Sequence, residues 1–99
     1  MAYEVIILPG AEQDMDEAIL WYEKQQAGLG IRFYLRLLDI LEELRTGPQY
    51  YHFIHEEYRR ITIGPFPYNL IYRVAGSKVL VLAVFHQSRD TEGFFKGGK

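Results

Sequence analysis

A few cationic and imidazole side chains stand out in the last third of the chain, because most residues around them are apolar. Arg60 lies in the segment Arg59 to Ile63, and His86 and Arg89 follow the apolar run Val79 to Phe85. An arginine can hold an anion such as a phosphate, and a histidine can exchange a proton near neutral pH. We therefore take Arg60, His86 and Arg89 as candidate catalytic residues.

Purely structural roles for these side chains remain open. His86 could be a hydrogen-bonding residue at a strand end, and Arg89 could pair with Asp90 or Glu92. For Arg60 the pattern is more informative, because side chains alternate between the two faces of a strand. If Ile61 faces a hydrophobic core, its neighbour Arg60 lies on the opposite, open face.

The elements that must position these residues follow from hydrophobic periodicity. Alternating or apolar runs predict strands over 3–8, 59–63, 68–74 and 79–85, and a period of 3.6 residues predicts helices over 11–26 and 31–44. The core-facing positions are expected to be Ala11, Met15, Ala18, Ile19 and Tyr22 in the first helix, and Ile31, Tyr34, Leu35, Leu38, Leu41 and Leu44 in the second. Residues 48–57 show no clean period and are predicted to form a loop.

The order of these elements predicts an α+β fold, written βααβββ, in which a helical hairpin packs on one face of an antiparallel sheet. The 99 residues fit a single domain over 1–99, with 96–99 expected to fray. His52 and His55 lie in an irregular segment, so no metal site is predicted there, and no sequence motif indicates a cofactor.

Charge and composition exclude several classes of protein. The net charge is −2 and the pI is near 5.9, which argues against broad binding of nucleic acid. Residues 1–49 carry an excess of acidic side chains, whereas residues 50–99 carry an excess of basic ones. The chain contains no cysteine and no apolar run long enough to span a bilayer, so we expect a soluble, cytoplasmic protein.

Several segments, in order along nearly the whole chain, carry a family resemblance. They are Trp21-Tyr22-Glu23, Gly28-Leu29-Gly30-Ile31-Arg32-Phe33, Arg60 before Phe66-Pro67-Tyr68, Ile71-Tyr72-Arg73-Val74 and Val81 to Asp90. Together they resemble the RelE/ParE superfamily of bacterial toxins from type II toxin–antitoxin systems. The resemblance implies the toxin of a plasmid-stabilisation module that inhibits growth, and a cognate antitoxin as its protein partner.

The resemblance leaves the cellular target open, because RelE-like members cut messenger RNA in the ribosome and ParE-like members inhibit DNA gyrase. This chain departs from the RelE-like set at Thr62, at Asn69 and near Phe95, where that set has basic or hydroxyl-bearing residues. We therefore expect a ParE-like toxin that binds a protein such as DNA gyrase and is not an enzyme. The alternatives are a ribosome-dependent endoribonuclease using Arg60, His86 and Arg89, and a degenerate toxin that only binds antitoxin.

Four apolar residues lie off the main helical stripes and are candidates for an antitoxin-binding groove. They are Leu20, Trp21, Phe33 and Leu37. A groove along a helical hairpin, together with an exposed sheet edge, would suit an antitoxin tail that folds on binding. The same four residues could instead fill the core between the helices.

Overall fold

The computed structural model describes residues 2–89 and 94–95. Strand β1 (Glu4–Ile7) leads into helix α1 (Pro9–Gln25), and a short turn connects it to helix α2 (Leu29–Thr46). The chain then forms a 3-10 turn, η1 (Pro48–Tyr50), and the strands β2 (Phe53–His55), β3 (Tyr58–Thr62), β4 (Tyr68–Ala75) and β5 (Lys78–His86). None of the described helices is both long and apolar enough to cross a membrane.

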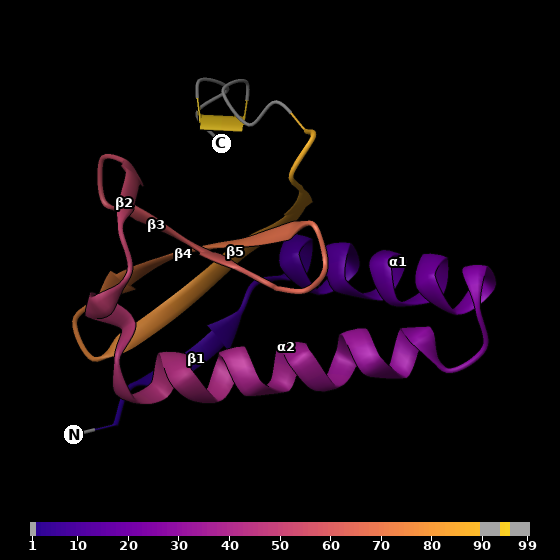
Figure 1. Ribbon diagram of the computed structural model, residues 1–99. Helices are drawn as coiled ribbons and strands as arrows, with labels where there is room; N and C mark the ends of the chain where they lie inside the picture. The colour runs from indigo at the N-terminus through magenta and orange to yellow at the C-terminus, as the bar shows by residue number, and fades with distance from the viewer. Residues whose placement is uncertain (1, 90–93, 96–99) are drawn as a thin grey trace.

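The strands form a mixed sheet in the order β1-β5-β4-β3-β2, and both helices lie on one of its faces (Figure 1). The predicted fold class is therefore confirmed, with two differences in detail. Strand β1 pairs with β5 in parallel, whereas the other neighbouring pairs are antiparallel. The direction of β1 follows from how the helical hairpin returns the chain to the sheet, which the residues of β1 themselves do not encode.

The second difference is strand β2, which lies in the segment predicted to be a loop. It has only three residues and joins β3 through a tight turn in which Glu56 has a φ of 49°. Such a turn is usually marked in a sequence by Gly or Asn, which adopt positive φ at little cost. With Glu56-Glu57 at the turn, the hairpin carries no recognisable signal.

The core between helices and sheet confirms the predicted stripe of α1, but it confirms that of α2 only at its C-terminal end, where Leu44 is buried and Leu41 packs against the core. Ala11, Met15, Ala18 and Tyr22 are buried, as expected. On α2 the buried residues are Gly30, Phe33, Leu37, Ile40 and Leu44. Four members of the predicted stripe, Ile31, Tyr34, Leu35 and Leu38, are instead between 42% and 61% exposed.

Gly30 explains the orientation of α2, because both faces of this helix are apolar in sequence. A Cβ atom at Gly30 would lie 2.6 Å from the carbonyl oxygen of Ile19, so only glycine allows α2 to approach α1 this closely. The Glu23 carboxylate holds the same contact by accepting hydrogen bonds of about 3.0 Å from the backbone N–H groups of Gly28 and Gly30. The close contact therefore turns Phe33 and Leu37 inward.

A bulge in β5 determines which residues reach each face at the end of that strand. Ile71 pairs with Ala83 but Tyr72 pairs with Val81, so Leu82 is an extra residue in the ladder. Val84 consequently packs on the helix side, whereas Phe85 joins Ile71 in a second apolar cluster on the open face. Without the bulge, strict alternation would place Val81 and Phe85 on the same face.

Candidate functional site

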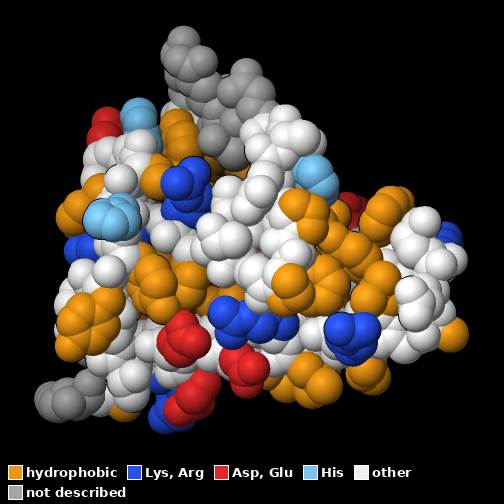
Figure 2. Space-filling model, in the orientation of Figure 1, with side chains coloured by type: hydrophobic (Ala, Val, Ile, Leu, Met, Phe, Trp, Pro, Cys, Tyr) orange, Lys and Arg blue, Asp and Glu red, His pale blue; other side chains and the backbone are white. Residues whose placement is uncertain are grey.

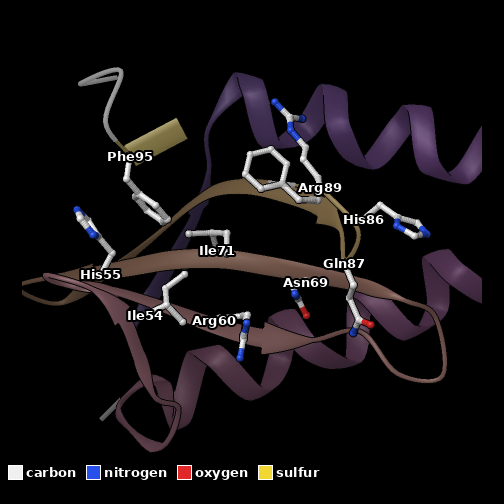
Figure 3. A pocket seen from close by; sticks show the side chains of 10 residues that line it. Ile54, His55, Arg60, Asn69, Ile71, His86, Gln87, Arg89 and Phe95 are labelled. Carbon is white, nitrogen blue, oxygen red and sulfur yellow. The ribbon is translucent and has the colours of Figure 1, made fainter. Parts of the chain in front are cut away.

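The open face of the sheet carries a cavity of about 480 Å³, into which strands β3, β4 and the end of β5 contribute side chains (Figure 3). Its lining comprises Ile54, His55, Arg60, Asn69, Ile71, Phe85, His86, Gln87, Arg89 and Phe95. The structure thus brings Arg60, His86 and Arg89 to one cavity. It also places Arg60 on the open face, since Ile61, its neighbour in β3, packs in the helix-side core.

The polar groups of this cavity are cationic or neutral. The guanidinium of Arg89 stacks on the Phe85 ring, 4.2 Å from its centroid. Thr62 Oγ1 donates a hydrogen bond of 3.2 Å to Asn69 Oδ1, so the oxygen of this amide already has a hydrogen-bond partner. No Asp or Glu is among the described residues that line the cavity. Such a surface can hold an anion, but it contains no carboxylate to act as a general base.

His86 is oriented by local hydrogen bonds and points away from the other side chains of the cavity (Figure 3). Its Nδ1 atom accepts a hydrogen bond of 3.0 Å from the backbone N–H of Ser88 and lies 2.8 Å from the Ser88 hydroxyl. Its ring packs edge-on against Tyr68, with 5.2 Å between centroids. These contacts are those of the strand-end hydrogen-bonding role that the sequence left open.

Aromatic residues near the C-terminus cover part of the open face. The Phe95 ring stacks on that of His55, with 4.7 Å between ring centroids, and its centroid lies 5.2 Å from that of Tyr58. The Phe94 ring packs edge-on against Phe85, with 5.2 Å between centroids. Nothing in the sequence indicated that His55 would line the cavity, because its strand was not predicted. Asp90 and Glu92, the expected partners of Arg89, lie outside the described residues.

A smaller cavity of about 280 Å³ lies between α1 and the end of β5. Its lining includes Asp14, Glu17, Trp21, Tyr68 and His86. Asp14 Oδ2 accepts a hydrogen bond of 3.0 Å from the backbone N–H of Val84, which lies beyond the last residue of β5 that pairs with β1. Burial is the main cause that raises the pKa of the Asp14 carboxyl above its ordinary value.

The four residues expected to bind antitoxin lie in two different environments, two on the surface and two in the core. Leu20 and Trp21 are 61% and 53% exposed, and Trp21 borders the cavity between α1 and β5. Phe33 and Leu37 are 0% and 2% exposed, which corrects their assignment to a groove, because they fill the core between helices and sheet. Among the described residues, no cluster of three or more His, Cys, Asp or Glu side chains could hold a metal ion.

Several solved structures share this fold. The chromosomal ParDE system of P. aeruginosa superposes with a TM-score of 0.76 at 16% identity, over 85% of this chain and 95% of that chain. The archaeal RelE-RelB complex from Pyrococcus horikoshii gives a TM-score of 0.59 at 17% identity, over 91% and 100% of the two chains. An E. coli RelE mutant bound to a RelB peptide gives 0.51 at 21% identity, over 100% and 97%.

The sequence itself decides the family. No curated protein matches this chain significantly. Residues 5–91, however, match the model of a family described as the ParE toxin of the type II toxin-antitoxin system parDE. This match spans both helices and every strand except the first residue of β1. The chain therefore belongs to the ParE toxin family of type II toxin–antitoxin systems.

Proposed function

We propose that this chain is a growth-inhibiting toxin that acts by binding a protein target such as DNA gyrase, and that a cognate antitoxin neutralises it. Family membership supports the toxin role. The observation that carries the mode of action is the chemistry of the open face. Cleavage of RNA by its own 2′-hydroxyl needs a proton acceptor, a proton donor and stabilisation of the phosphorane charge.

The open-face cavity offers cations for charge stabilisation but few groups for proton transfer. The hydroxyl of Thr62 is hydrogen-bonded to the side-chain amide of Asn69, so these two residues occupy each other. Phe95 contributes only an unreactive ring. The Nδ1 atom of His86 is already bound to Ser88. A toxin that works through protein contacts needs none of these groups to be reactive.

A DNA supercoiling assay tests this proposal directly. The chain, co-expressed with its antitoxin and separated from it, should inhibit supercoiling by bacterial DNA gyrase in a dose-dependent manner. Adding the antitoxin back should restore supercoiling. Full supercoiling activity at a molar excess of toxin over gyrase, with a toxin that still arrests growth, would rule out gyrase as the target.

A second function has one observation in its favour, since Arg60, Arg89, His55 and His86 all line one cavity. This set supports a ribosome-dependent endoribonuclease as the alternative. Primer extension on ribosome-associated transcripts would then show new 5′ ends after induction, and the double change Arg60→Ala and Arg89→Ala would remove them. A toxin without any effect on growth would instead be degenerate and retain antitoxin binding alone.

We further propose that the antitoxin binds at Leu20 and Trp21 on α1. Trp21 lies at the rim of the cavity between α1 and β5, where Asp14 and Glu17 carry negative charge and Arg89 carries positive charge. This combination suits a tail with an apolar anchor and flanking charged residues. Two of the structurally similar proteins are toxins solved with an antitoxin or antitoxin peptide, which supports this kind of partner.

Affinity measurements test the antitoxin site. Trp21→Ala should weaken antitoxin binding by roughly 30-fold, the loss typical of an aromatic hot spot, and Leu20→Ala by a smaller factor. Tyr50→Ala is the matched control, because Tyr50 is also a highly exposed aromatic residue but lies in η1, after the end of α2. Equal affinities for the Trp21 and Tyr50 variants would place the antitoxin elsewhere.

A further inference from the structure

The outer edge of β3 carries a short gap in its backbone hydrogen bonding. Ile63 donates to the carbonyl oxygen of Tyr68 in β4 at 2.8 Å, and neighbouring residues of a strand direct their backbone groups to opposite sides. Thr62 therefore directs its N–H and C=O groups away from β4. On this outer side, strand β2 pairs only with Tyr58 and Arg59, so it ends before it reaches Thr62.

The backbone groups on either side of this gap already have partners. The N–H of Arg60 donates to the carbonyl oxygen of His52 at 3.3 Å, and the carbonyl oxygen of Gly64 accepts from Arg36 Nε at 2.7 Å. The two outward groups of Thr62 lie between these bonds, and we call this place the Thr62 niche. A peptide in an extended conformation can fill it, because its N–H and C=O groups match those of a sheet edge.

The surroundings of the Thr62 niche carry more positive than negative charge. A cavity of about 370 Å³ opens there, and its lining includes Arg36, Glu43, His52 and Arg60. Glu43 accepts a hydrogen bond of 2.6 Å from the Tyr51 hydroxyl and lies 3.9 Å from Arg36 Nη1. Arg60 forms no ion pair with any residue that the structure describes. An acidic segment therefore complements this surface better than a basic one does.

Arg60 also joins the niche to the open face, because its side chain lines both this cavity and the open-face cavity. Successive side chains of an extended segment point to opposite sides. One of two neighbouring residues in a bound segment therefore reaches the open face beside Arg60. Figure 2 shows Lys, Arg and His side chains on the face of the molecule along which β3 runs.

We propose that the Thr62 niche binds an extended acidic segment of the toxin's protein target. The segment forms a β-bridge with the N–H and C=O groups of Thr62 and places a carboxylate against the guanidinium of Arg60. This inference rests on the proposed function, in which the toxin acts through contacts with a protein. RNA would also bring negative charge to Arg60, but it has no backbone that pairs with a sheet edge.

The niche lies apart from the site proposed for the antitoxin. Among the described residues, none lines both the cavity at Thr62 and the cavity at Trp21. Arg89 lines both the open-face cavity and the cavity at Trp21, so it does not distinguish the two partners. Changes at Thr62 and Arg60 should therefore impair binding of the target and spare binding of the antitoxin.

Binding of the purified toxin to immobilised DNA gyrase, measured by biolayer interferometry, tests the niche with two changes at one position. Thr62→Pro removes the outward N–H, which makes no hydrogen bond to β4, and proline is tolerated at such edge positions. Thr62→Ala shortens the side chain but keeps the N–H. The proline variant should bind gyrase at least tenfold more weakly than the alanine variant, because only proline prevents the β-bridge.

Arg60→Glu tests the charge of the niche and should raise the dissociation constant for gyrase at least tenfold, since it sets like charges against each other. Arg32→Glu is the matched control, because it reverses an exposed cation on α2 that does not line the cavity at Thr62. It should bind gyrase as the parent does. The antitoxin affinity of each variant should stay within about threefold of the parent, which also shows that the variant is folded.

Failure of this inference is distinguishable from failure of the proposed target. A parent toxin that does not bind gyrase rules out gyrase, and growth arrest on induction then serves as the measurement, with the same variants in the same expected order. Equal binding, or equal arrest, for Thr62→Pro and Thr62→Ala overturns the niche. A loss of antitoxin affinity as large as the loss of gyrase affinity also overturns it, because the antitoxin would then occupy the niche. New 5′ ends in ribosome-associated transcripts that disappear in Arg60→Glu overturn it in favour of RNA.

Discussion

At the scale of single residues, hydrogen bonds to the backbone decide what the polar side chains at the end of β5 can do. Asp14 reaches from α1 to the backbone N–H of Val84, which strand β1 is too short to cover. His86 is held by the backbone N–H of Ser88. The sequence makes His86 an acid–base candidate, yet in the structure both His86 and Asp14 complete the hydrogen bonding of nearby backbone.

Asp14→Asn provides a test of this role with a defined pH dependence. Burial is the first cause that raises the pKa of Asp14 above 3.8, so the folded chain keeps this proton at pH values where the unfolded chain has lost it. As pH rises above 3.8, the unfolded chain loses this proton first, and the stability of the folded chain therefore falls until its own Asp14 is ionised too. An asparagine oxygen can still accept from Val84 but carries no charge, so the Asn variant should gain stability relative to the parent over the same range.

Urea unfolding of the parent and of Asp14→Asn at a series of pH values from about 3.5 to 7 measures this difference. Asp14→Ala is the control for the hydrogen bond, because it removes the acceptor as well as the charge and should therefore be about 1 kcal/mol less stable than Asp14→Asn at every pH. A difference between Asn and Asp that does not change with pH would contradict the assignment of a raised pKa to Asp14.

At the scale of elements, the contact between α1 and α2 orients the second helix. Both faces of α2 are apolar, so hydrophobicity alone does not distinguish the buried Phe33 and Leu37 from the exposed Ile31 and Leu35. Gly30 makes the distinction, because it lets α2 approach the backbone of α1 at Ile19. The apolar face of α2 that carries Ile31 and Leu35 is then left exposed.

Gly30→Ala should therefore destabilise the fold. The added Cβ would lie 2.6 Å from the Ile19 oxygen and 3.0 Å from the Glu23 Cβ, so the helices must separate at a cost of roughly 1–3 kcal/mol. Gly10→Ala is the matched control, because Gly10 also lies in a helix but a Cβ atom there would lie 3.9 Å from the nearest atom, the carbonyl oxygen of Leu82. Chemical denaturation should show Gly10→Ala at or above parental stability, owing to the better helix propensity of alanine. Equal midpoints for the two variants would show that the helices accommodate the methyl group.

At the scale of the whole molecule, the sheet has two apolar faces, which are covered differently. The helices cover one face with a large core, whereas the cluster of Ile71, Ala83 and Phe85 on the other face is covered by Phe94 and Phe95. Figure 1 shows this short C-terminal segment on the side of the sheet opposite α2. The C-terminal aromatics thus act as a small third layer beside the open-face cavity.

Replacing both aromatics, Phe94→Ala with Phe95→Ala, should expose this second cluster. The double variant should lose roughly 2–4 kcal/mol of stability, less than two fully buried phenylalanines would cost, because both rings are only half-buried. It should also bind more of the hydrophobic dye ANS. Tyr50→Ala, an exposed aromatic change, is the control and should alter neither property. Parental stability in the double variant would mean that the cluster does not depend on this cover.

Several features of this protein follow from sequence pattern alone. Local periodicity determines both helices, the core stripe of α1 around Met15 and Tyr22, and the strands β1, β3, β4 and β5, because these signals depend on residues close together in the chain. Alternation was also sufficient to place Arg60 on the open face, opposite to the core-facing Ile61, since β3 has no bulge within its pairing with β4.

Only the tertiary structure decided which way α2 faces, how β1 pairs, and what surrounds His86. A helix that is apolar on two sides has no preferred side until Gly30 meets α1, and an edge strand has no preferred direction until the hairpin returns the chain. The surroundings of His86 depend on the bulge at Leu82 and on Asp14, which is 70 residues from Val84 in sequence. Contacts between residues so far apart leave no local periodicity, which is why the fold was needed to find them.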